Sequence, residues 1–89
     1  MTVSREVTIV NPLGFHMRPA AQFVRMASNF TAEIEVAKDS LAVNGKSIMG
    51  VMMLQAEAGS TITIRAEGSD AEAAVEALSK LVVDGFGET

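Results

Sequence analysis

Hydrophobic and polar residues alternate along some stretches of the chain and recur every three or four residues along others. Alternation places successive side chains on opposite faces of a strand, whereas the longer spacing aligns them on one face of a helix. Together with the turn signals between them, these patterns predict strands at residues 3–10, 31–37, 40–43 and 61–66 and helices at residues 19–29, 46–55 and 71–82. The expected order of elements is β-α-β-β-α-β-α.

Each predicted helix and strand has one apolar face. The first helix, for example, has an apolar stripe at positions i, i+3, i+4 and i+7, formed by Ala20, Phe23, Val24 and Ala27. Elements of this kind bury their apolar sides against each other in two layers. We therefore expect an α+β fold, a two-layer open-faced β-sandwich in which three helices cover one face of a four-stranded antiparallel sheet. Residues 1–89 are expected to form a single domain.

Several residues mark where the elements begin and end. Pro19 is suited to the first turn of a helix, where its missing N–H costs nothing. Ser47 is a candidate N-cap of the second helix, and residues 69–72 fit a capping box with Glu72 three positions after the serine. Gly85 is expected to follow the last helix in a left-handed conformation. Residues 44–45, Asn-Gly, predict a turn because both tolerate a positive φ.

Composition excludes several classes of function. The net charge is −4 and no basic run is present, so binding of nucleic acid by phosphate neutralisation is not expected. With no cysteine and one histidine, neither a disulfide framework nor a histidine cluster for zinc is available, and we expect no metal and no cofactor. The first residues lack the apolar core of a signal peptide, and the longest apolar run, 50–54, is far too short to span a membrane. These features favour a cytoplasmic protein with no membrane insertion.

Candidate chemistry is concentrated in residues 11–20, where a strand pattern gives way to a helix pattern. Gly14 allows a tight turn, and the single histidine, His16, stands just before the predicted helix. The free N–H groups and the dipole of a helix N-terminus favour an anion and disfavour imidazolium, and Arg18 offers a planar fork suited to phosphate oxygens. His16 is therefore a candidate phosphoryl acceptor. The alternative, a solvated loop histidine, is equally compatible with these residues alone.

A resemblance favours the first interpretation. Residues 14–24, with His16, Arg18 and Pro19, resemble the active-site motif of HPr, the histidine-containing phosphocarrier family of the bacterial phosphotransferase system. Residues 46–52 are similar to the regulatory-serine segment of that family, and the similarity continues to Phe86-Gly87-Glu88. It covers nearly the whole chain. The resemblance implies a carrier, not an enzyme in its own right, in which enzyme I phosphorylates Nδ1 of His16, Arg18 contacts the phosphoryl oxygens, and an enzyme IIA domain receives the group.

The same resemblance implies further sites and partners. Ser47, which is an ordinary helix cap on residue type alone, matches the serine that HPr kinase/phosphorylase modifies, and this implies regulation, with a transcriptional regulator as a further partner. Contact with enzyme I and enzyme IIA is expected at the following residues: Phe15, Met17, Ala20, Ile48, Met49 and Met52. Met17 replaces the small residue usual in the family, and Phe15 replaces the commoner leucine. We expect a monomer.

The alternative is a mainly regulatory binding protein, in catabolite control or in the nitrogen branch of the system. Such a protein would act through the phosphorylation state of Ser47 or His16.

Overall fold

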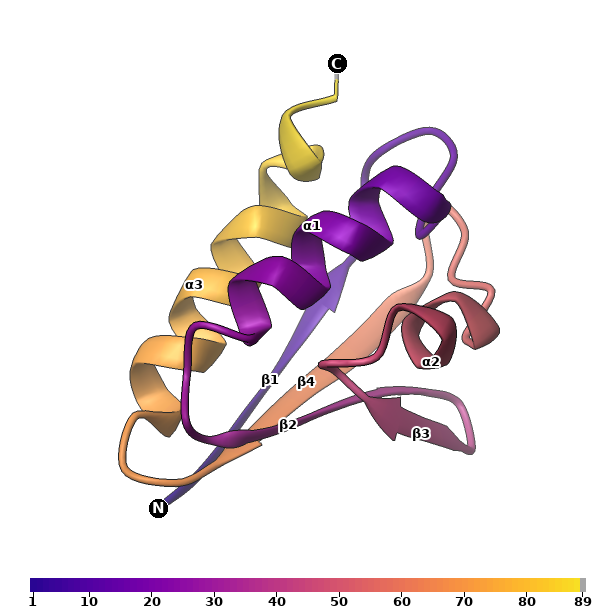
Figure 1. Cartoon of the computed structure of the whole chain (residues 1–89). Coiled ribbons are helices and arrows are strands. Elements are labelled where there is room, and N and C mark those ends of the chain that lie inside the picture. Colours follow the sequence, from indigo (N-terminus) through magenta and orange to yellow (C-terminus); the bar gives the residue numbers. More distant parts are fainter. Residues whose placement is uncertain (89) are drawn as a thin grey trace.

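A computed structural model describes residues 1–88 and shows a four-stranded antiparallel sheet covered on one face by three α-helices (Figure 1). Within these residues the elements are β1 (Thr2–Thr8), α1 (Met17–Ala27), β2 (Glu33–Lys38), β3 (Leu41–Asn44), α2 (Ile48–Met53), β4 (Thr61–Glu67) and α3 (Ala71–Val83), followed by a single 3₁₀ turn, Gly85–Gly87. Strand order in the sheet is β1-β4-β2-β3. The predicted fold class and order of elements are confirmed.

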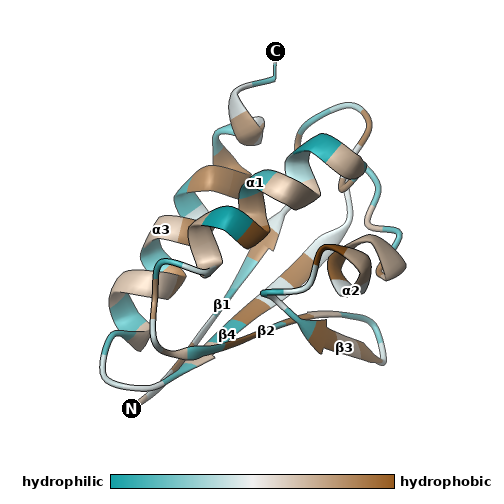
Figure 2. Ribbon diagram, in the orientation of Figure 1, coloured by the Kyte–Doolittle hydropathy of each residue, from teal (hydrophilic) through white to brown (hydrophobic). Residues whose placement is uncertain are grey.

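The strand register brings apolar residues together on the covered face of the sheet. In the β1–β4 pair Val7 lies opposite Ile62, and in the β2–β4 pair Val36 lies opposite Ile64. All four side chains are buried. Since side chains alternate along a strand, the residues between them face water. Figure 2 shows this alternation as teal and brown along β4.

The core lies between this sheet face and the helices α1 and α3. Phe23 from α1 and Leu78 from α3 are fully buried in it. Three members of the predicted α1 stripe are buried as expected, and Val24 is half-buried beside them. Within residues 1–88, the structure contains no helix of the length and apolar character that a bilayer span requires.

The helix α1 begins two residues earlier than predicted. Its N-cap is His16, and Pro19 occupies the third helical position instead of the first. Both positions are compatible with proline, because the N–H groups of the first turn have no partner within the helix. The consequence is that His16 itself stands at the entrance of the helix.

The predicted capping box before α3 is wrong. Asp70, not Ser69, is the N-cap, and it makes no side-chain capping bond. Its carboxylate instead accepts the backbone N–H groups of Thr31 and Ala32, each at 2.8 Å, and so ties the start of α3 to the segment before β2. The Thr31 N–H, with that of Ala32, lowers the pKa of Asp70 below its ordinary value against a smaller opposing effect of desolvation. At the other end, Gly85 adopts φ +66 after α3, as predicted.

The turn at residues 44–45 is confirmed, but for a different reason. Gly45 does not adopt a positive φ. A Cβ there would lie 2.6 Å from Cγ2 of Ile34, so glycine is required by close packing against β2.

Candidate functional site

The loop between β1 and α1 is held in a tight, specific shape. Gly14 adopts φ +64, and a Cβ at this position would lie 2.1 Å from the carbonyl oxygen of Ala56. Glycine is therefore required for both conformation and space. The next residue, Phe15, donates its N–H to the same Ala56 carbonyl at 2.9 Å. The loop is thus fastened to the segment that follows α2, immediately before His16.

His16 is presented at the N-terminus of α1, with its side chain 36% exposed. Its Nε2 lies 3.2 Å from Oε2 of Glu88, a residue 72 positions away in the sequence. A carboxylate can only accept a hydrogen bond, so Nε2 must carry the proton. In the neutral imidazole the lone pair then resides on Nδ1, so Nδ1 is the ring nitrogen with a free electron pair.

The start of α1 combines positive charge with free donors. The first bond of the helix runs from the Ala20 N–H to the His16 carbonyl, so the N–H groups of Met17 and Arg18 precede it and point out of the helix end. The first turn contains no acidic residue, and Arg18 is exposed there. A cation at this end opposes the helix dipole and destabilises the helix slightly, but it adds positive charge to a helix end that favours an anion.

Sequence reasoning missed Glu88 and Asn11 as members of this site. Asn11 is 1% exposed, and its Nδ2 donates to the Gly14 carbonyl at 2.8 Å and to Oε1 of Glu88 at 3.0 Å. Asn11 therefore connects the loop to the C-terminal residues, and Glu88 connects Asn11 to His16. No local pattern reveals a contact between residues more than seventy positions apart; the only signal was the similarity of the last residues to a known family.

Two predicted partner-binding residues are corrected. Phe15 is 4% exposed and Ala20 is 0% exposed, so neither presents its side chain to a partner. The ring of Phe15 packs between Phe23 and Phe86, with both ring centroids 5.4 Å away. Phe15 and Ala20 thus support the site from within the core.

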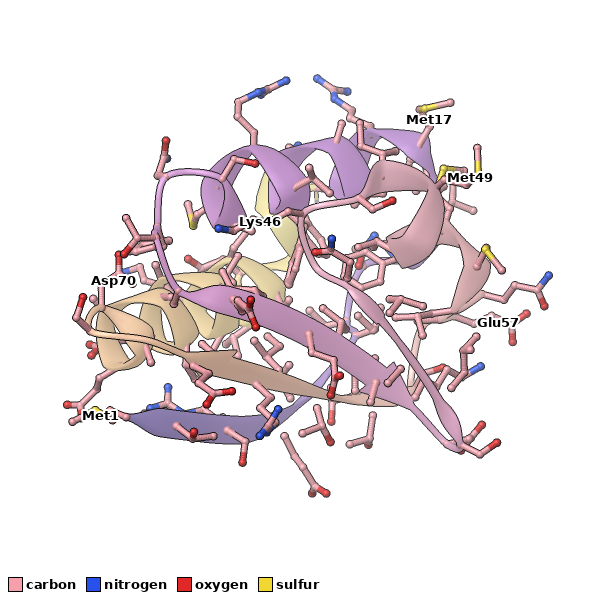
Figure 3. All side chains as sticks on the ribbon, turned by 60° about the horizontal axis from the view of Figure 1, so that its bottom comes forward. Met1, Met17, Lys46, Met49, Glu57 and Asp70 are labelled. Carbon is pink, nitrogen blue, oxygen red and sulfur yellow. The ribbon has the colours of Figure 1, made fainter. Side chains whose placement is uncertain are left out.

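The other four predicted partner-binding residues gather on one surface. We call it the methionine patch; it lines a shallow cavity of about 530 Å³ formed by Met17, Ile48, Met49, Met52, Met53 and Gln55. Met17 is 62% and Met49 is 75% exposed, and Figure 3 shows them close together at one end of the molecule. The patch joins α2 to the first turn of α1, where His16 stands. An exposed apolar surface of this kind is typical of a protein interface.

Ser47 is the N-cap of α2, as predicted. Its Oγ accepts the Gly50 N–H at 3.0 Å. The side chain is half-buried, and the two residues that follow it belong to the methionine patch. A charge placed on this oxygen would therefore lie at the edge of the patch.

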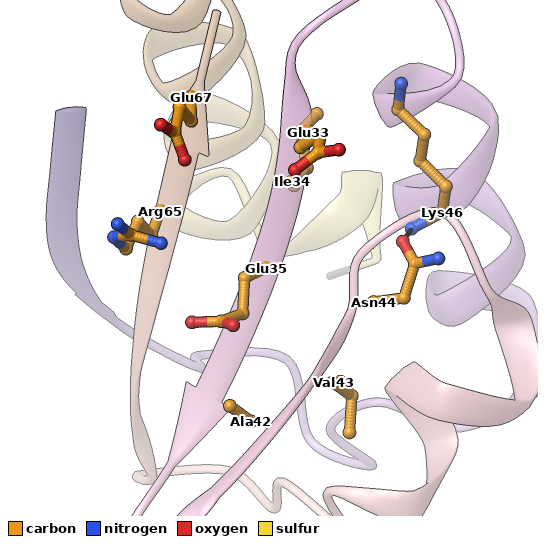
Figure 4. A pocket seen from close by; sticks show the side chains of 9 residues that line it. All are labelled: Glu33, Ile34, Glu35, Ala42, Val43, Asn44, Lys46, Arg65 and Glu67. Carbon is orange, nitrogen blue, oxygen red and sulfur yellow. Dashed lines mark hydrogen bonds between the residues drawn. The ribbon is translucent and has the colours of Figure 1, made fainter. Parts of the chain in front are cut away.

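A groove of about 470 Å³ on the open face of the sheet is a separate feature (Figure 4). Glu33 and Glu67 lie opposite each other across β2 and β4, and Glu35 lies opposite Arg65. Within residues 1–88, no group of three or more histidine, cysteine, aspartate or glutamate side chains is arranged to hold a metal ion. The groove lies on the side of the sheet that the helices leave open, so it is not part of the His16 site.

Comparison with known proteins agrees with this geometry. A family model described as "PTS HPr component phosphorylation site" matches residues 3–84. The phosphocarrier protein HPr of Cupriavidus necator is 42% identical over 86 residues, which cover 97% of this chain and 97% of that protein.

Solved structures agree as well. HPr-C-His from Thermoanaerobacter tengcongensis matches with a TM-score of 0.94 at 45% identity, over 98% of each chain. The Bacillus subtilis catabolite repression protein Crh, described as a swapped dimer, matches with a TM-score of 0.77 at 38% identity, over 93% of this chain and 95% of that one. A phosphorylation-site model that spans almost the whole chain, with relatives of this identity and coverage, shows that the chain belongs to the HPr family of phosphotransferase-system phosphocarriers.

Proposed function

We propose that this chain accepts a phosphoryl group on Nδ1 of His16 from phosphorylated enzyme I and passes it to an enzyme IIA domain. The observation that carries this proposal is the contact between Nε2 of His16 and the Glu88 carboxylate at 3.2 Å. In the transfer, the Nδ1 lone pair forms an N–P bond while the bond between phosphorus and the donor breaks. The reverse exchange delivers the group, so the chain is a stoichiometric carrier and not a catalyst of its own reaction.

The surroundings of His16 suit this transfer. Phosphoryl transfer needs positioning and stabilisation of negative charge more than covalent chemistry by the protein. Arg18 and the free N–H groups at the start of α1 supply the charge. The half-exposed ring allows two partners to reach the same nitrogen in turn. The methionine patch beside it is the surface on which we place both partners.

The test is phosphorylation by enzyme I and phosphoenolpyruvate. We expect one acid-labile phosphate per chain, no label on His16→Ala, and slower but complete labelling of Arg18→Ala. Arg25→Ala is the matched control, because Arg25 lies in the last turn of the same helix, and it should be labelled like the wild type. Acid-labile label on His16→Ala would refute the assignment.

Regulation through Ser47 is a second proposal, supported by its position and by the similarity to the catabolite repression protein Crh. A phosphate would add about −2 charges beside the methionine patch and repel acidic partners. HPr kinase/phosphorylase would install it, and a transcriptional regulator would read it. Incubation with ATP and the kinase should label Ser47 and leave Ser47→Ala unlabelled. If the wild type takes up no ATP-derived phosphate, this proposal fails.

We also propose that the chain acts as a cytoplasmic monomer. In the structure one core unites the sheet with α1 and α3 in a single chain. The swapped dimer described for Crh is the competing arrangement. Light scattering coupled to size-exclusion chromatography distinguishes a mass near 9.4 kDa from one twice as large.

A further inference from the structure

Asn11 is a buried polar residue that makes two hydrogen bonds through the same atom. Its Nδ2 donates to the Gly14 carbonyl at 2.8 Å and to Oε1 of Glu88 at 3.0 Å. Its Oδ1 has no hydrogen-bond partner among the residues the structure describes, although the side chain is 99% buried. A buried amide is stabilised only by the hydrogen bonds that it makes, so the two donated bonds hold Asn11 in this position.

The amide has only one workable orientation. If Oδ1 and Nδ2 were exchanged, an oxygen would face the Gly14 carbonyl and the Glu88 carboxylate, both of which only accept. The Gly14 carbonyl is fixed in turn, because Gly14 also donates its N–H to the Asn11 carbonyl at 3.1 Å. Asn11 therefore always presents a donor to Glu88.

We propose that Asn11 is a positioning residue that sets the direction of the hydrogen-bond chain ending on His16. It occupies Oε1 of Glu88 with a donor, holds the carboxylate of the last described residue in place, and turns Oε2 toward Nε2 of His16. The direction of the chain keeps the proton on Nε2 and the lone pair on Nδ1. The importance of this tautomer for phosphoryl transfer rests on the proposed function. The direction of the hydrogen bonds from Asn11 through Glu88 to His16 does not depend on it.

Glu88→Gln tests the direction, because a primary amide has one accepting and one donating end. Asn11 offers only a donor, so the oxygen of Gln must turn to Asn11 and its NH₂ must face Nε2 of His16. Nε2 would then have to accept, and the ring proton would move to Nδ1. Nitrogen-15 NMR of the ring at about pH 9, where an imidazole is neutral, distinguishes the two tautomers. We expect mainly Nε2–H in the wild type and mainly Nδ1–H in Glu88→Gln.

The double variant Asn11→Ala with Glu88→Gln isolates the role of Asn11. Without the fixed donor the Gln amide is free to turn its oxygen to His16, and Nε2–H should again predominate. Asn11→Ser with Glu88→Gln should behave alike, because a hydroxyl can donate or accept and imposes no direction, and it serves if the alanine variant fails to fold. If Glu88→Gln keeps Nε2–H, or if the folded double variant keeps the tautomer of Glu88→Gln, the proposal is overturned.

The measurement needs no phosphate and no partner protein. If the variants show the expected tautomer changes but the wild type takes up no phosphate, the proposed function alone is refuted.

Discussion

Replacing Phe15 with alanine should show how much the packing of the loop before His16 contributes to the stability of the fold. Phe15 is 4% exposed, and its ring lies between those of Phe23 and Phe86, at an angle of 82° to the first and 53° to the second. Truncation would leave a cavity where α1, the loop and the C-terminal residues meet. It would also free Phe86, which precedes Glu88 by two residues.

The size of the effect follows from this packing. Removing a buried phenylalanine ring costs about 3–5 kcal/mol, to which each aromatic pair contributes about 0.5–1.5 kcal/mol. A chain of 89 residues has a total free energy of unfolding of about 4–13 kcal/mol, from roughly 0.05–0.15 kcal/mol per residue. Phe15→Ala should therefore remove a large share of the stability.

Urea denaturation followed by far-ultraviolet circular dichroism is the suitable assay, since the chain has no tryptophan or tyrosine to report by fluorescence. With a slope of about 1–3 kcal/mol per molar urea, the midpoint should fall by about 2 M. Leu13→Ala is the matched control from the same loop, because Leu13 is 73% exposed and its loss should change stability by no more than about 0.5 kcal/mol. A loss below about 1 kcal/mol for Phe15→Ala would refute the reasoning.

Two further predictions concern side chains that accept backbone N–H groups. Ser47→Ala should lower the free energy of unfolding by about 1 kcal/mol, because the Gly50 N–H loses its capping bond of 3.0 Å. Ser47→Asp should retain most of the stability, because its carboxylate can also accept this N–H. Equal melting temperatures for the two variants would contradict this prediction. Asp70 stabilises the fold above its ordinary pKa and loses this effect as the pH falls through its lowered pKa. In urea titrations the wild type should therefore exceed Asp70→Asn in stability at about pH 7, and the difference should shrink toward about pH 2; a difference independent of pH would show that the carboxylate contributes nothing by its charge.

Local patterns were sufficient to predict the elements of this fold. Alternation fixed which residues of β4 face the core, and helical spacing fixed the buried side of α1, because both depend only on the geometry of the element itself. The cap at Ser47 and the left-handed Gly85 were predictable for the same reason. The joining of the elements into a two-layer sandwich followed from the single apolar face of each element. The pairing of β1 with β4 was not predicted, because it joins strands at opposite ends of the sequence.

The parts that sequence reasoning missed depend on contacts between distant segments. Phe15 stands next to the candidate phosphoryl acceptor His16 in a loop, and its burial depends on Phe86 from the other end of the chain. Asp70 takes the place of the predicted cap Ser69, and its carboxylate accepts the backbone N–H groups before β2 instead of capping α3. In both cases contacts with a distant segment, which no local pattern shows, decide what the side chain does.

The Glu88 contact depends on an unusual path of the chain after α3. Gly85, Phe86 and Gly87 adopt φ values of +66, +57 and +75, three successive residues in the left-handed region. For Phe86 this conformation costs about 1–2 kcal/mol. Its side chain is 4% exposed, and burying a phenylalanine contributes about 1.5–3 kcal/mol, so the packing of Phe86 against Phe15 offsets the strain. The reversal of the chain that brings Glu88 to His16 is therefore stabilised by the same Phe15–Phe86 contact that anchors the loop before His16. One aromatic cluster thus positions both members of the His16–Glu88 pair.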